Sequence, residues 1–548
     1  MRAKIAAPRW WIGIGAAGLA SVLFYSTLLF SGPLDHRDWS GHHFHYFDWV
    51  RISMVDHRTL PLYMADAKMT KNFIANAEAP TLGPLVGLLP LLGTDAYIKL
   101  LIVAFTCAGC VGMFALLRDF EVEWPIAAPL AVVFAFNGFF FSHFAAGHHW
   151  AMGGQVLPWL VLLLRRAASG ASAAIWIAAA INAFTIMGGQ HQPFIWQNLV
   201  LGAYAVLLAL QRRSPRPLVC LVAIVACTAG LGAVKLLPMV LEFADYDPTQ
   251  HTIGMPAASL WMSFFAHGQG PGTRLPDLEF TSGAGWWEYA FYSGPVFAVC
   301  LVAAVSSLRR TWPIVAITAF FAWIAIDAAG GFDLWGRIAD LPVWRTQRSP
   351  SRFLFVATFG VIVAGGVGLQ RVAARSGPST RRALAWICCG VALLGYLDLR
   401  RESQPWQEAS IGNEVESRTH HPRRTRLPAD AGATVTLREF APNAMVFRVV
   451  AREDGRAVFP VRFAKNARKR QRRGEDPGSP EWFVEGFEPI AADGKLAVEV
   501  PAGERDVAIA YRPRGFRTGI AISIATCGLL AGVALRRRAA ARADSQFD

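Results

Sequence analysis

Charged residues are scarce in this chain. Only 17% of its 548 residues are Asp, Glu, Lys or Arg, whereas 53% are hydrophobic, and the mean hydropathy is +0.33. A soluble protein of this length does not need so much apolar surface, so the composition argues against one. The apolar residues also fall in blocks of about twenty, the length that a helix needs to cross a bilayer core. The sequence therefore predicts a polytopic α-helical membrane protein.

The polar segments contain no cysteine. All eight cysteines lie inside apolar blocks, at Cys107, Cys110, Cys220, Cys227, Cys300, Cys388, Cys389 and Cys527. This placement excludes a disulfide framework or a cysteine-based zinc site in the loops. Cys107 and Cys110 form a C-x-x-C pair, but inside a membrane such a pair indicates packing and not redox chemistry.

Acidic residues are outnumbered by basic ones, 39 to 53, which gives a formal net charge of +14. An excess of positive charge can indicate nucleic-acid binding. Here most of the Lys and Arg residues lie in short clusters between apolar blocks, so we exclude nucleic acid as a partner and apply the positive-inside rule. The clusters fall on one side of the predicted spans, which predicts a bacterial inner-membrane protein with both termini in the cytoplasm. They are 165–166, 212–216, 309–310, 371–382 and 536–538.

About twelve apolar blocks are long enough, or nearly so, to span a membrane. They predict a transmembrane domain over residues 1–399, with a long first outer loop at 31–94, and a last helix with a basic tail at 517–548. The blocks are 10–30, 95–117, 124–146, 151–164, 172–189, 194–211, 217–243, 289–308, 311–330, 352–370, 383–399 and 517–535.

Residues 400–516 differ in kind from the rest of the chain. They are polar, and runs with alternating apolar residues, such as "ATVTLREF" and "KLAVEV", are separated by turn sequences such as "EDGR" and "ADGK". Alternation with a period of two, interrupted by Gly and Asp, is typical of short antiparallel strands. The segment therefore predicts a small periplasmic β-sandwich between the last two helices.

The first outer loop holds a dense group of ionisable residues, in "LDHRDWSGHHFHYFDWV". A helix that began near Trp39 would place Asp38, His42 and His45 on one face, because they follow i, i+4, i+7 spacing. A carboxylate there could act as a general base on an acceptor hydroxyl. His42 and His45 could hold a divalent metal ion or, when protonated, bind phosphate. The alternative is a polar interfacial loop with solvated acids.

Two further outer turns place polar side chains between glycines at a membrane boundary. They are "AAGHHWAMGGQ", which includes His148, and "MGGQHQPF", which includes Gln190 and His191. Glycine lets a ligand approach the backbone closely, so these side chains are candidates for substrate binding. Ordinary helix-end polarity explains them equally well.

Three arginines occur together on the outer side, in "LPVWRTQRSPSRFLF": Arg345, Arg348 and Arg352. They depart from the positive-inside bias, and guanidinium groups bind phosphate in a bidentate manner. A phosphate-linked donor that arrives from the lipid would meet them at headgroup depth. Snorkelling toward lipid headgroups is the alternative.

The chain resembles the YfhO-like branch of the GT-C glycosyltransferase superfamily in an ordered set of segments, which include "RDWSGHHFHYFDWV", "FNGFFFSHFAAGHHW", "MGGQHQP", "LGAVKLLPMVLEF" and "LPVWRTQRSPSRFLF". The resemblance covers nearly the whole chain. It matches Asp38 to the acidic residue of the family's first outer loop, with Asp35 in reserve. It matches His148 to a histidine that follows the third span. Arg348 and Arg352 match the arginines of an R-x-P-x-R-F pattern, which here is "RSPSRF".

The resemblance implies a membrane glycosyltransferase that takes a sugar from a polyprenyl-phosphate donor and passes it to a glycan, lipid or protein acceptor. It implies that Asp38 removes the acceptor's proton in a single displacement with inversion, while arginines stabilise the phosphate. No cofactor is implied beyond the divalent cation expected at His42 and His45. The histidine-rich first loop and the basic stretch "AKNARKRQRRGED" depart from the family pattern, and they leave the acceptor and the metal open.

Two other functions fit a membrane protein of this organisation. A transporter or flippase of a lipid-linked glycan would need charged groups near mid-membrane, whereas the ionisable residues here cluster at the outer boundary. A non-catalytic cell-envelope scaffold would use the sandwich as its binding module. The position of the ionisable residues favours the enzyme.

Overall fold

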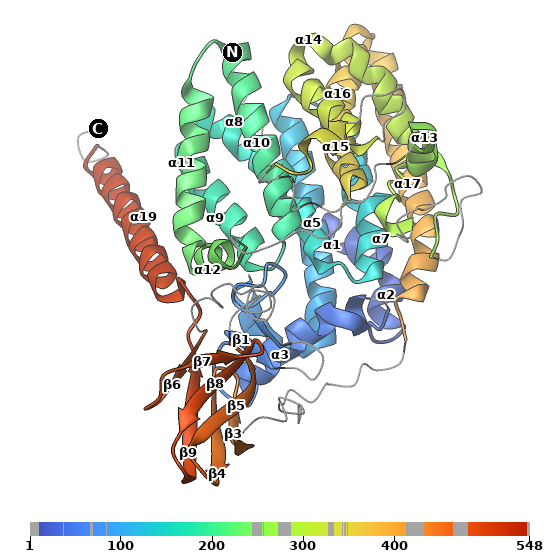
Figure 1. Cartoon of the computed structure of the whole chain (residues 1–548). Helices are drawn as coiled ribbons and strands as arrows, with labels where there is room; N and C mark the ends of the chain where they lie inside the picture. Colours follow the sequence, from blue (N-terminus) through green and yellow to red (C-terminus); the bar gives the residue numbers. More distant parts are fainter. Residues whose placement is uncertain are drawn as a thin grey trace.

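The computed structural model (Figure 1) consists of a helical body with a small all-β unit at one end. The β unit follows the long helix α17 (Pro378–Ala409), and the chain then returns to the body as the single helix α19 (Phe516–Asp544). The structure describes residues 10–36, 38–65, 70–83, 85–243, 255, 257–271, 286–326, 334–341, 344, 347, 349–412, 432–463 and 481–544.

The helical body is built from mostly apolar segments, and a helix satisfies its backbone hydrogen bonds within one segment, as lipid requires. Its other helices are α1 (Trp10–Phe24), α2 (Ser26–Phe30), α3 (Phe44–Val55), α4 (Leu89–Leu92), α5 (Thr94–Asp119), α6 (Trp124–Phe136), α7 (Gly138–Ala146), α8 (Leu157–Ala168), α9 (Ala173–Met187), α10 (His191–Arg212), α11 (Arg216–Leu231), α12 (Ala233–Phe243), α13 (Ala257–Phe265), α14 (Gly294–Ala325), α15 (Leu334–Ile338) and α16 (Leu354–Arg375). Shorter turns are the π-helix η1 (Trp39–His43) and the 3-10 helices η2 (Val86–Leu88), η3 (His149–Val156), η4 (Trp286–Glu288) and η6 (Pro350–Phe353).

Six helical segments in the described part of the chain are long and apolar enough to cross a membrane. A seventh is added if α11 and α12, which are bent by 85° at their junction, count as one span. A mostly helical membrane protein with a small β unit is therefore confirmed, while a total of about twelve spans stays a prediction. The six segments are Thr94–Asp119, Trp124–Ala146, His191–Arg212, Gly294–Ala325, Pro350–Arg375 and Phe516–Arg536.

The helix α14 covers two predicted spans in one continuous helix. Its contacts with α16 show that it nevertheless reverses direction. Its first half runs along α16 toward the C-terminal end of that helix, and its second half runs back. Pro313, shortly after the reversal, removes a helical hydrogen bond there. The contacts are Cys300 with Gly365, Ala303 with Gly368 and Thr318 with Gly360.

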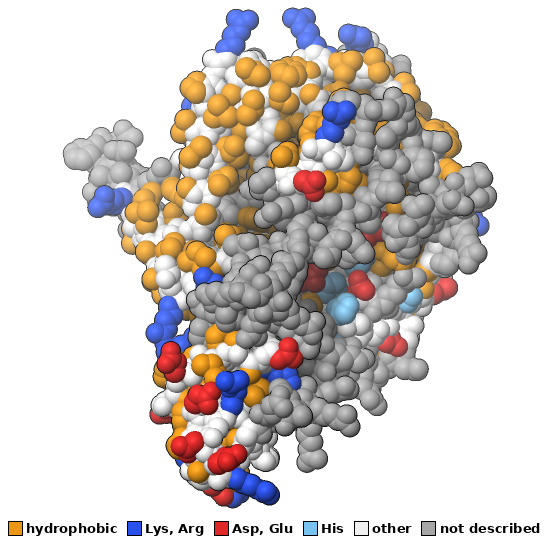
Figure 2. Space-filling model, in the orientation of Figure 1, with side chains coloured by type: hydrophobic (Ala, Val, Ile, Leu, Met, Phe, Trp, Pro, Cys, Tyr) orange, Lys and Arg blue, Asp and Glu red, His pale blue; other side chains and the backbone are white. Residues whose placement is uncertain are grey.

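Basic side chains gather at the end of the body opposite the β unit. At that end Arg165 and Arg166 both bond to Asp119, with N–O distances of 2.9 and 3.4 Å, and Arg310 bonds to Glu121 at 2.7 Å. Figure 2 shows Lys and Arg side chains that project from this end, beyond an apolar surface on the helices. This separation of charge along the body agrees with the positive-inside pattern. Which end faces the cytoplasm stays a prediction.

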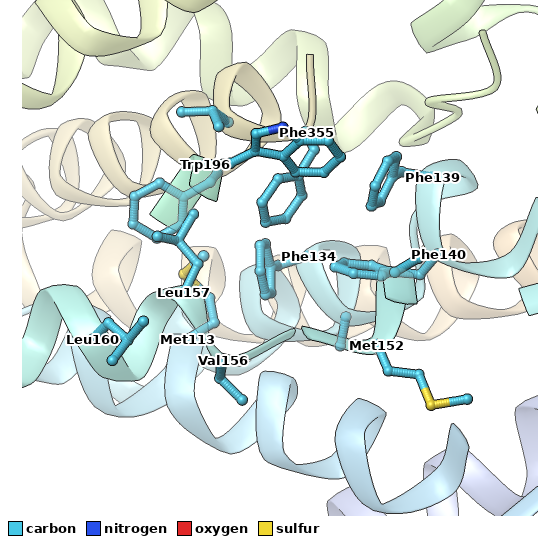
Figure 3. Packing of buried hydrophobic residues seen from close by; sticks show 14 of the residues in the cluster. Met113, Phe134, Phe139, Phe140, Met152, Val156, Leu157, Leu160, Trp196 and Phe355 are labelled. Atoms are coloured by element: carbon cyan, nitrogen blue, oxygen red, sulfur yellow. The ribbon is translucent and has the colours of Figure 1, made fainter. Parts of the chain in front are cut away.

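Aromatic side chains fill the centre of the body (Figure 3). Phe134 and Phe140 pack against Phe355 of α16, and Trp196 of α10 joins them, with ring centres 5.7–6.3 Å apart. Aromatic pairs contribute about 0.5–1.5 kcal/mol beyond their buried area. Phe139 extends this cluster toward the polar site, where its ring centre lies 4.5 Å from that of His143.

The β unit is a sandwich of two antiparallel sheets around one core. One sheet has the order β3-β4-β9-β6 and the other has the order β5-β8-β7. The sequence predicts strands within 400–516, but α17 continues to Ala409 and the first strand begins at Ala433. The strands are β3 (Ala433–Ala441), β4 (Ala444–Ala451), β5 (Gly455–Arg462), β6 (Trp482–Val484), β7 (Ile490–Ala492), β8 (Lys495–Val500) and β9 (Gly503–Tyr511).

The first outer loop lies against this sandwich, as Figure 1 shows for α3 and β1. The loop forms a hairpin of β1 (Tyr63–Ala65) and β2 (Thr70–Asn72). Tyr63 is fully buried in the sandwich core, where its ring centre lies 4.7 Å from that of Trp482 and 4.8 Å from that of Tyr511. The sandwich therefore holds the same loop that carries the candidate carboxylate.

Candidate active site

A glycine turn at the end of α7 brings the candidate residues together. Gly147 has a φ of +96°, and a Cβ at this position would meet the backbone nitrogen of Trp39 at 2.4 Å. Glycine therefore allows the first outer loop to lie directly on the turn. His148 follows, and its Nε2 lies 2.9 Å from Oδ2 of Asp38. The Asp38 side chain is 42% exposed, whereas that of His148 is 8% exposed.

Asp38 is ionised and His148 is neutral. Burial raises the pKa of Asp38, but the hydrogen bond from His148 and the positive charge that His148, His43 and His42 carry when protonated outweigh burial and lower the pKa to about 2. Burial lowers the pKa of His148, and the positive charge of Arg352 acts in the same direction against the pull of Asp38. The pair is therefore a carboxylate held by a neutral hydrogen-bond donor.

His143, on α7, continues this hydrogen-bond chain. Its Nδ1 lies 2.7 Å from Nδ1 of His148, and its side chain is completely buried. A neutral His148 that donates from Nε2 to Asp38 has a bare Nδ1, so His143 must donate to it. The hydrogen bonds thus assign the tautomers and run in one direction, from His143 to His148 to Asp38.

The histidine that contacts the glycine turn is His43, which the helical spacing did not predict. Residues 39–43 form a π-helix, which holds more residues per turn than an α-helix. The residue one turn after Asp38 is therefore His43 and not His42. Nδ1 of His43 donates to the carbonyl oxygen of Gly147 at 2.5 Å.

The expected cation site at His42 and His45 has no support in this geometry. His42 is exposed, whereas His45 is buried and has its Nε2 2.9 Å from the carbonyl oxygen of Ser40. The two imidazoles therefore do not share a face. The wider turn of the π-helix rotates the residues that follow it around the helix axis. Within the ranges that the structure describes, no group of three or more His, Cys, Asp and Glu side chains could hold a metal ion.

Glu78 is a second carboxylate at the site, and the sequence predicts no role for it. Its Oε2 lies 3.6 Å from Nε2 of His43, and its side chain is 34% exposed. Burial opposes charge on both groups, but their mutual attraction raises the pKa of His43 and lowers the pKa of Glu78 well below its ordinary value. The surrounding sequence "NAEAP" carries no motif, so only the contact with His43 reveals this residue. Figure 2 shows histidine and acidic side chains together on one face of the body, in the half nearer the sandwich.

Arg352, predicted to bind phosphate, lies in a buried ion pair. Its Nε donates to Oε2 of Glu288 at 2.6 Å, its Nη2 donates to the other carboxylate oxygen, and its Nη1 donates to Oε1 of Gln192 at 2.5 Å. The guanidinium carbon lies 4.6 Å from the ring centre of Trp150, which stacks on His148 at 5.2 Å. Arg352 thus belongs to the same cluster as His148, but Glu288 balances its charge.

Gln190 and His191 lie at the start of α10, close to the glycine turn. The side chain of Gln190 is buried, and its Oε1 has no hydrogen-bond partner among the described residues. Nδ1 of His191 likewise has none in that part of the chain. The charge of His191 acts on Glu78, which places His191 on the Glu78 side of the cluster.

Of the three remaining predicted residues, the structure describes only Asp35. Asp35 lies beside the residues that follow α17, where a Cβ on Gly412 would meet its Oδ2 at 2.5 Å. Asp38 and not Asp35 therefore contacts His148. Arg345 and Arg348 lie outside the residues that the structure describes.

Comparison with known proteins gives no family for this chain, since no family model and no curated protein match it. Among solved structures it is similar to the cryo-EM structure of the arabinofuranosyltransferase AftD from mycobacteria, with 15% identity and a TM-score of 0.48. That match covers 93% of this chain and 40% of AftD. A mutant of AftD matches with 16% identity and a TM-score of 0.40, over 92% of this chain and 42% of that one. Similarity at this level assigns no residue and no substrate.

Proposed function

We propose that the protein is a membrane glycosyltransferase of the inner membrane. It transfers a sugar from a polyprenyl-phosphate donor to an acceptor hydroxyl on the outer side, with inversion. The observation that carries this proposal is the hydrogen bond from neutral His148 to ionised Asp38. This bond fixes one carboxylate oxygen and leaves Oδ1 of a partly exposed side chain to accept a proton. The resemblance in sequence also matches both residues to functional positions.

The reaction needs one base and no acid. The acceptor oxygen forms a bond to the anomeric carbon while the bond from that carbon to the phosphate oxygen breaks. The polyprenyl phosphate leaves with the electron pair, and the hydroxyl proton moves to Oδ1 of Asp38. A pKa of about 2 makes Asp38 a weak base. It suffices because the hydroxyl proton becomes strongly acidic as its oxygen bonds to carbon.

The donor phosphate lies on the Arg352 side of Asp38 in this proposal. A guanidinium group has five N–H groups, and the bonds to Glu288 and Gln192 use three of them, so two remain for phosphate oxygens. Charge-assisted hydrogen bonds of this kind are strong. Because Glu288 balances the charge of Arg352, Arg352 orients the phosphate more than it attracts it. Arg345 and Arg348 remain proposed phosphate ligands from their sequence pattern.

The proposed orientation places the Asp38 cluster and the sandwich in the periplasm, with both termini in the cytoplasm. It agrees with the basic side chains at the opposite end of the body. A lipid-linked donor would then enter from the outer leaflet. The acceptor is a glycan, lipid or protein that reaches the same surface.

The test is sugar transfer by the purified protein in detergent micelles. The donor is the lipid-linked sugar that accumulates in a strain lacking the gene, and the acceptor is a membrane extract of that strain. We expect transfer by the wild type and a loss of about 10²–10⁴-fold in Asp38→Asn. Asp56→Asn changes an exposed acid in the same loop and should keep the wild-type rate.

Two results would contradict the proposal. Transfer by Asp38→Asn at the wild-type rate would remove Asp38 from the mechanism. A protein that forms no glycosidic bond in micelles but moves the lipid-linked sugar across vesicles would be a flippase, because only transport needs a bilayer to cross.

A further inference from the structure

His148 and His149 belong to opposite sides of the turn that follows α7. His148 contacts Asp38 and joins the cluster of Arg352. His149 packs against His43, with ring centres 4.5 Å apart. In the proposed displacement, the acceptor oxygen approaches the anomeric carbon from the face opposite the phosphate. The His43 side of Asp38 is therefore the side on which the rest of the acceptor lies.

Glu78 lies on that side, and contacts with Asn76, Lys235 and Gly189 restrict the backbone around it. Its N–H donates to Oδ1 of Asn76 at 3.2 Å. The buried amine of Lys235 donates to the carbonyl oxygens of Asn76 and Ala79, at 2.9 and 2.5 Å. Gly189 has a φ of +81°, and a Cβ there would lie 2.4 Å from the carbonyl oxygen of Glu78. Burial of an amine and the use of a glycine both cost folding free energy. Both restrict the position of Glu78, which indicates that this position has a function.

The Glu78 carboxylate has a fixed charge and unused acceptor capacity. His43 donates one N–H to Gly147 and faces Glu78 with the other, so it holds the carboxylate in its ionised form. The side chain of Glu78 remains 34% exposed, which leaves acceptor positions that a ligand can reach.

We propose that Glu78 binds neighbouring hydroxyl groups of a carbohydrate acceptor, and that His43 orients Glu78 for this contact. A carboxylate accepts hydrogen bonds from two adjacent hydroxyls. A polyprenol or a serine or threonine side chain offers a single hydroxyl, which the reaction itself uses. The inference rests on the proposed function for the position of the donor, and it narrows the acceptor to a glycan.

The test is saturation-transfer NMR with the full-length protein in a detergent that has no sugar headgroup. The probes are methyl glycosides of common hexoses and pentoses. We expect at least one glycoside to bind and Glu78→Gln to bind it about 10- to 100-fold more weakly, since a hydrogen bond to a charged group is lost. Asp56→Asn should bind like the wild type. The absence of glycoside binding to the wild type, or equal binding to Glu78→Gln, would overturn the proposal.

A second variant and kinetic measurements distinguish the loss of a contact from the loss of the fold. Glu78→Asp keeps the carboxylate on a shorter side chain. Partial recovery of glycoside binding in this variant would show that Glu78→Gln lost a contact and not its fold. In the micelle assay of sugar transfer, Glu78→Gln should raise the acceptor KM and leave the donor KM unchanged. A rise in the donor KM instead would refute the acceptor assignment.

The two proposals fail in different ways. If Asp38→Asn loses transfer while glycosides bind equally to wild type and Glu78→Gln, the enzyme assignment stands and the acceptor subsite falls. If Asp38→Asn transfers normally but Glu78→Gln loses glycoside binding, the subsite stands without Asp38 as base.

Discussion

Nδ1 of His143 lies 2.7 Å from Nδ1 of His148, and at this distance one imidazole must donate and the other accept. The hydrogen bond from Nε2 of His148 to Asp38 decides the direction, because it leaves Nδ1 of His148 as the acceptor. His143, which is completely buried, therefore stabilises this tautomer of His148 by donating to its Nδ1. His143 is a positioning residue that acts on Asp38 through His148.

Replacement of His143 should slow transfer only when the new side chain cannot donate a hydrogen bond to Nδ1 of His148. In His143→Phe, Nδ1 of His148 has no donor, so His148 can move its hydrogen to Nδ1 and release Asp38. We expect a rate about 10-fold lower, the equivalent of one buried hydrogen bond. In His143→Asn, the amide nitrogen replaces Nδ1 and should restore most of the rate. Equal rates for the two variants in the micelle assay would show that His143 only fills space.

Removal of His148 should move the acid limb of the pH–rate profile upward. In the wild type the pKa of Asp38 is about 2, so the base stays ionised from about pH 4 to pH 8. In His148→Phe, burial raises the pKa of Asp38 and only the charges of His43 and His42 oppose it. Transfer should then fall with decreasing pH within that range. A profile as flat as that of the wild type would contradict the assigned hydrogen bond.

The same pKa shift predicts a stability difference in acid. A carboxyl group with a lowered pKa stabilises the fold fully above its ordinary value, 3.8 for Asp38, and this contribution is lost as the pH falls through about 2. His148→Phe removes the shift, so its unfolding midpoint should lie closest to that of the wild type at the lowest pH. Thermal unfolding in detergent at several pH values measures this.

Loss of Glu288 should destabilise the protein far more than loss of an exposed acid. The side chains of Arg352 and Glu288 are only 10% and 6% exposed, so Glu288→Ala leaves a buried guanidinium without its partner, which costs about 3–5 kcal/mol. The matched control is Glu121→Ala, because the Arg310–Glu121 pair is 41% and 77% exposed and such pairs contribute about 1 kcal/mol or less. Similar unfolding midpoints for both variants would place Arg352 in contact with water.

The membrane character of the chain could be predicted from sequence because lipid imposes a strong local constraint. Each of the six candidate spans corresponds to predicted apolar blocks, and the strands lie where the period-two runs occur. The sequence located the ends of helices less accurately than it located the spans. Nothing in the polar start of 400–516 marks it as helical, yet it extends α17 to Ala409.

The site was only partly predictable, because its main contacts join distant segments. Sequence pattern singled out Asp38 and His148, which the structure brings together across 110 positions. It missed His43, since a π-helix has no simple sequence signal, and it missed Glu78, whose meaning depends on His43. It also could not show that Glu288 neutralises Arg352, because ion pairs between distant loops leave no trace in local composition.

The buried position of Tyr63 predicts that the sandwich stabilises the catalytic loop. Tyr63 belongs to the first outer loop, yet it completes the sandwich core, and Asn443 between β3 and β4 accepts from the Leu62 N–H at 2.7 Å. Tyr63→Ala should cost about 3–5 kcal/mol in local stability, as loss of a buried aromatic side chain does. Hydrogen exchange should then rise over residues 56–65, and transfer should fall. Phe483→Ala, which removes an exposed aromatic from the same sandwich, is the control. If exchange in the loop stays unchanged in Tyr63→Ala, the sandwich is an independent module, as a scaffold would require.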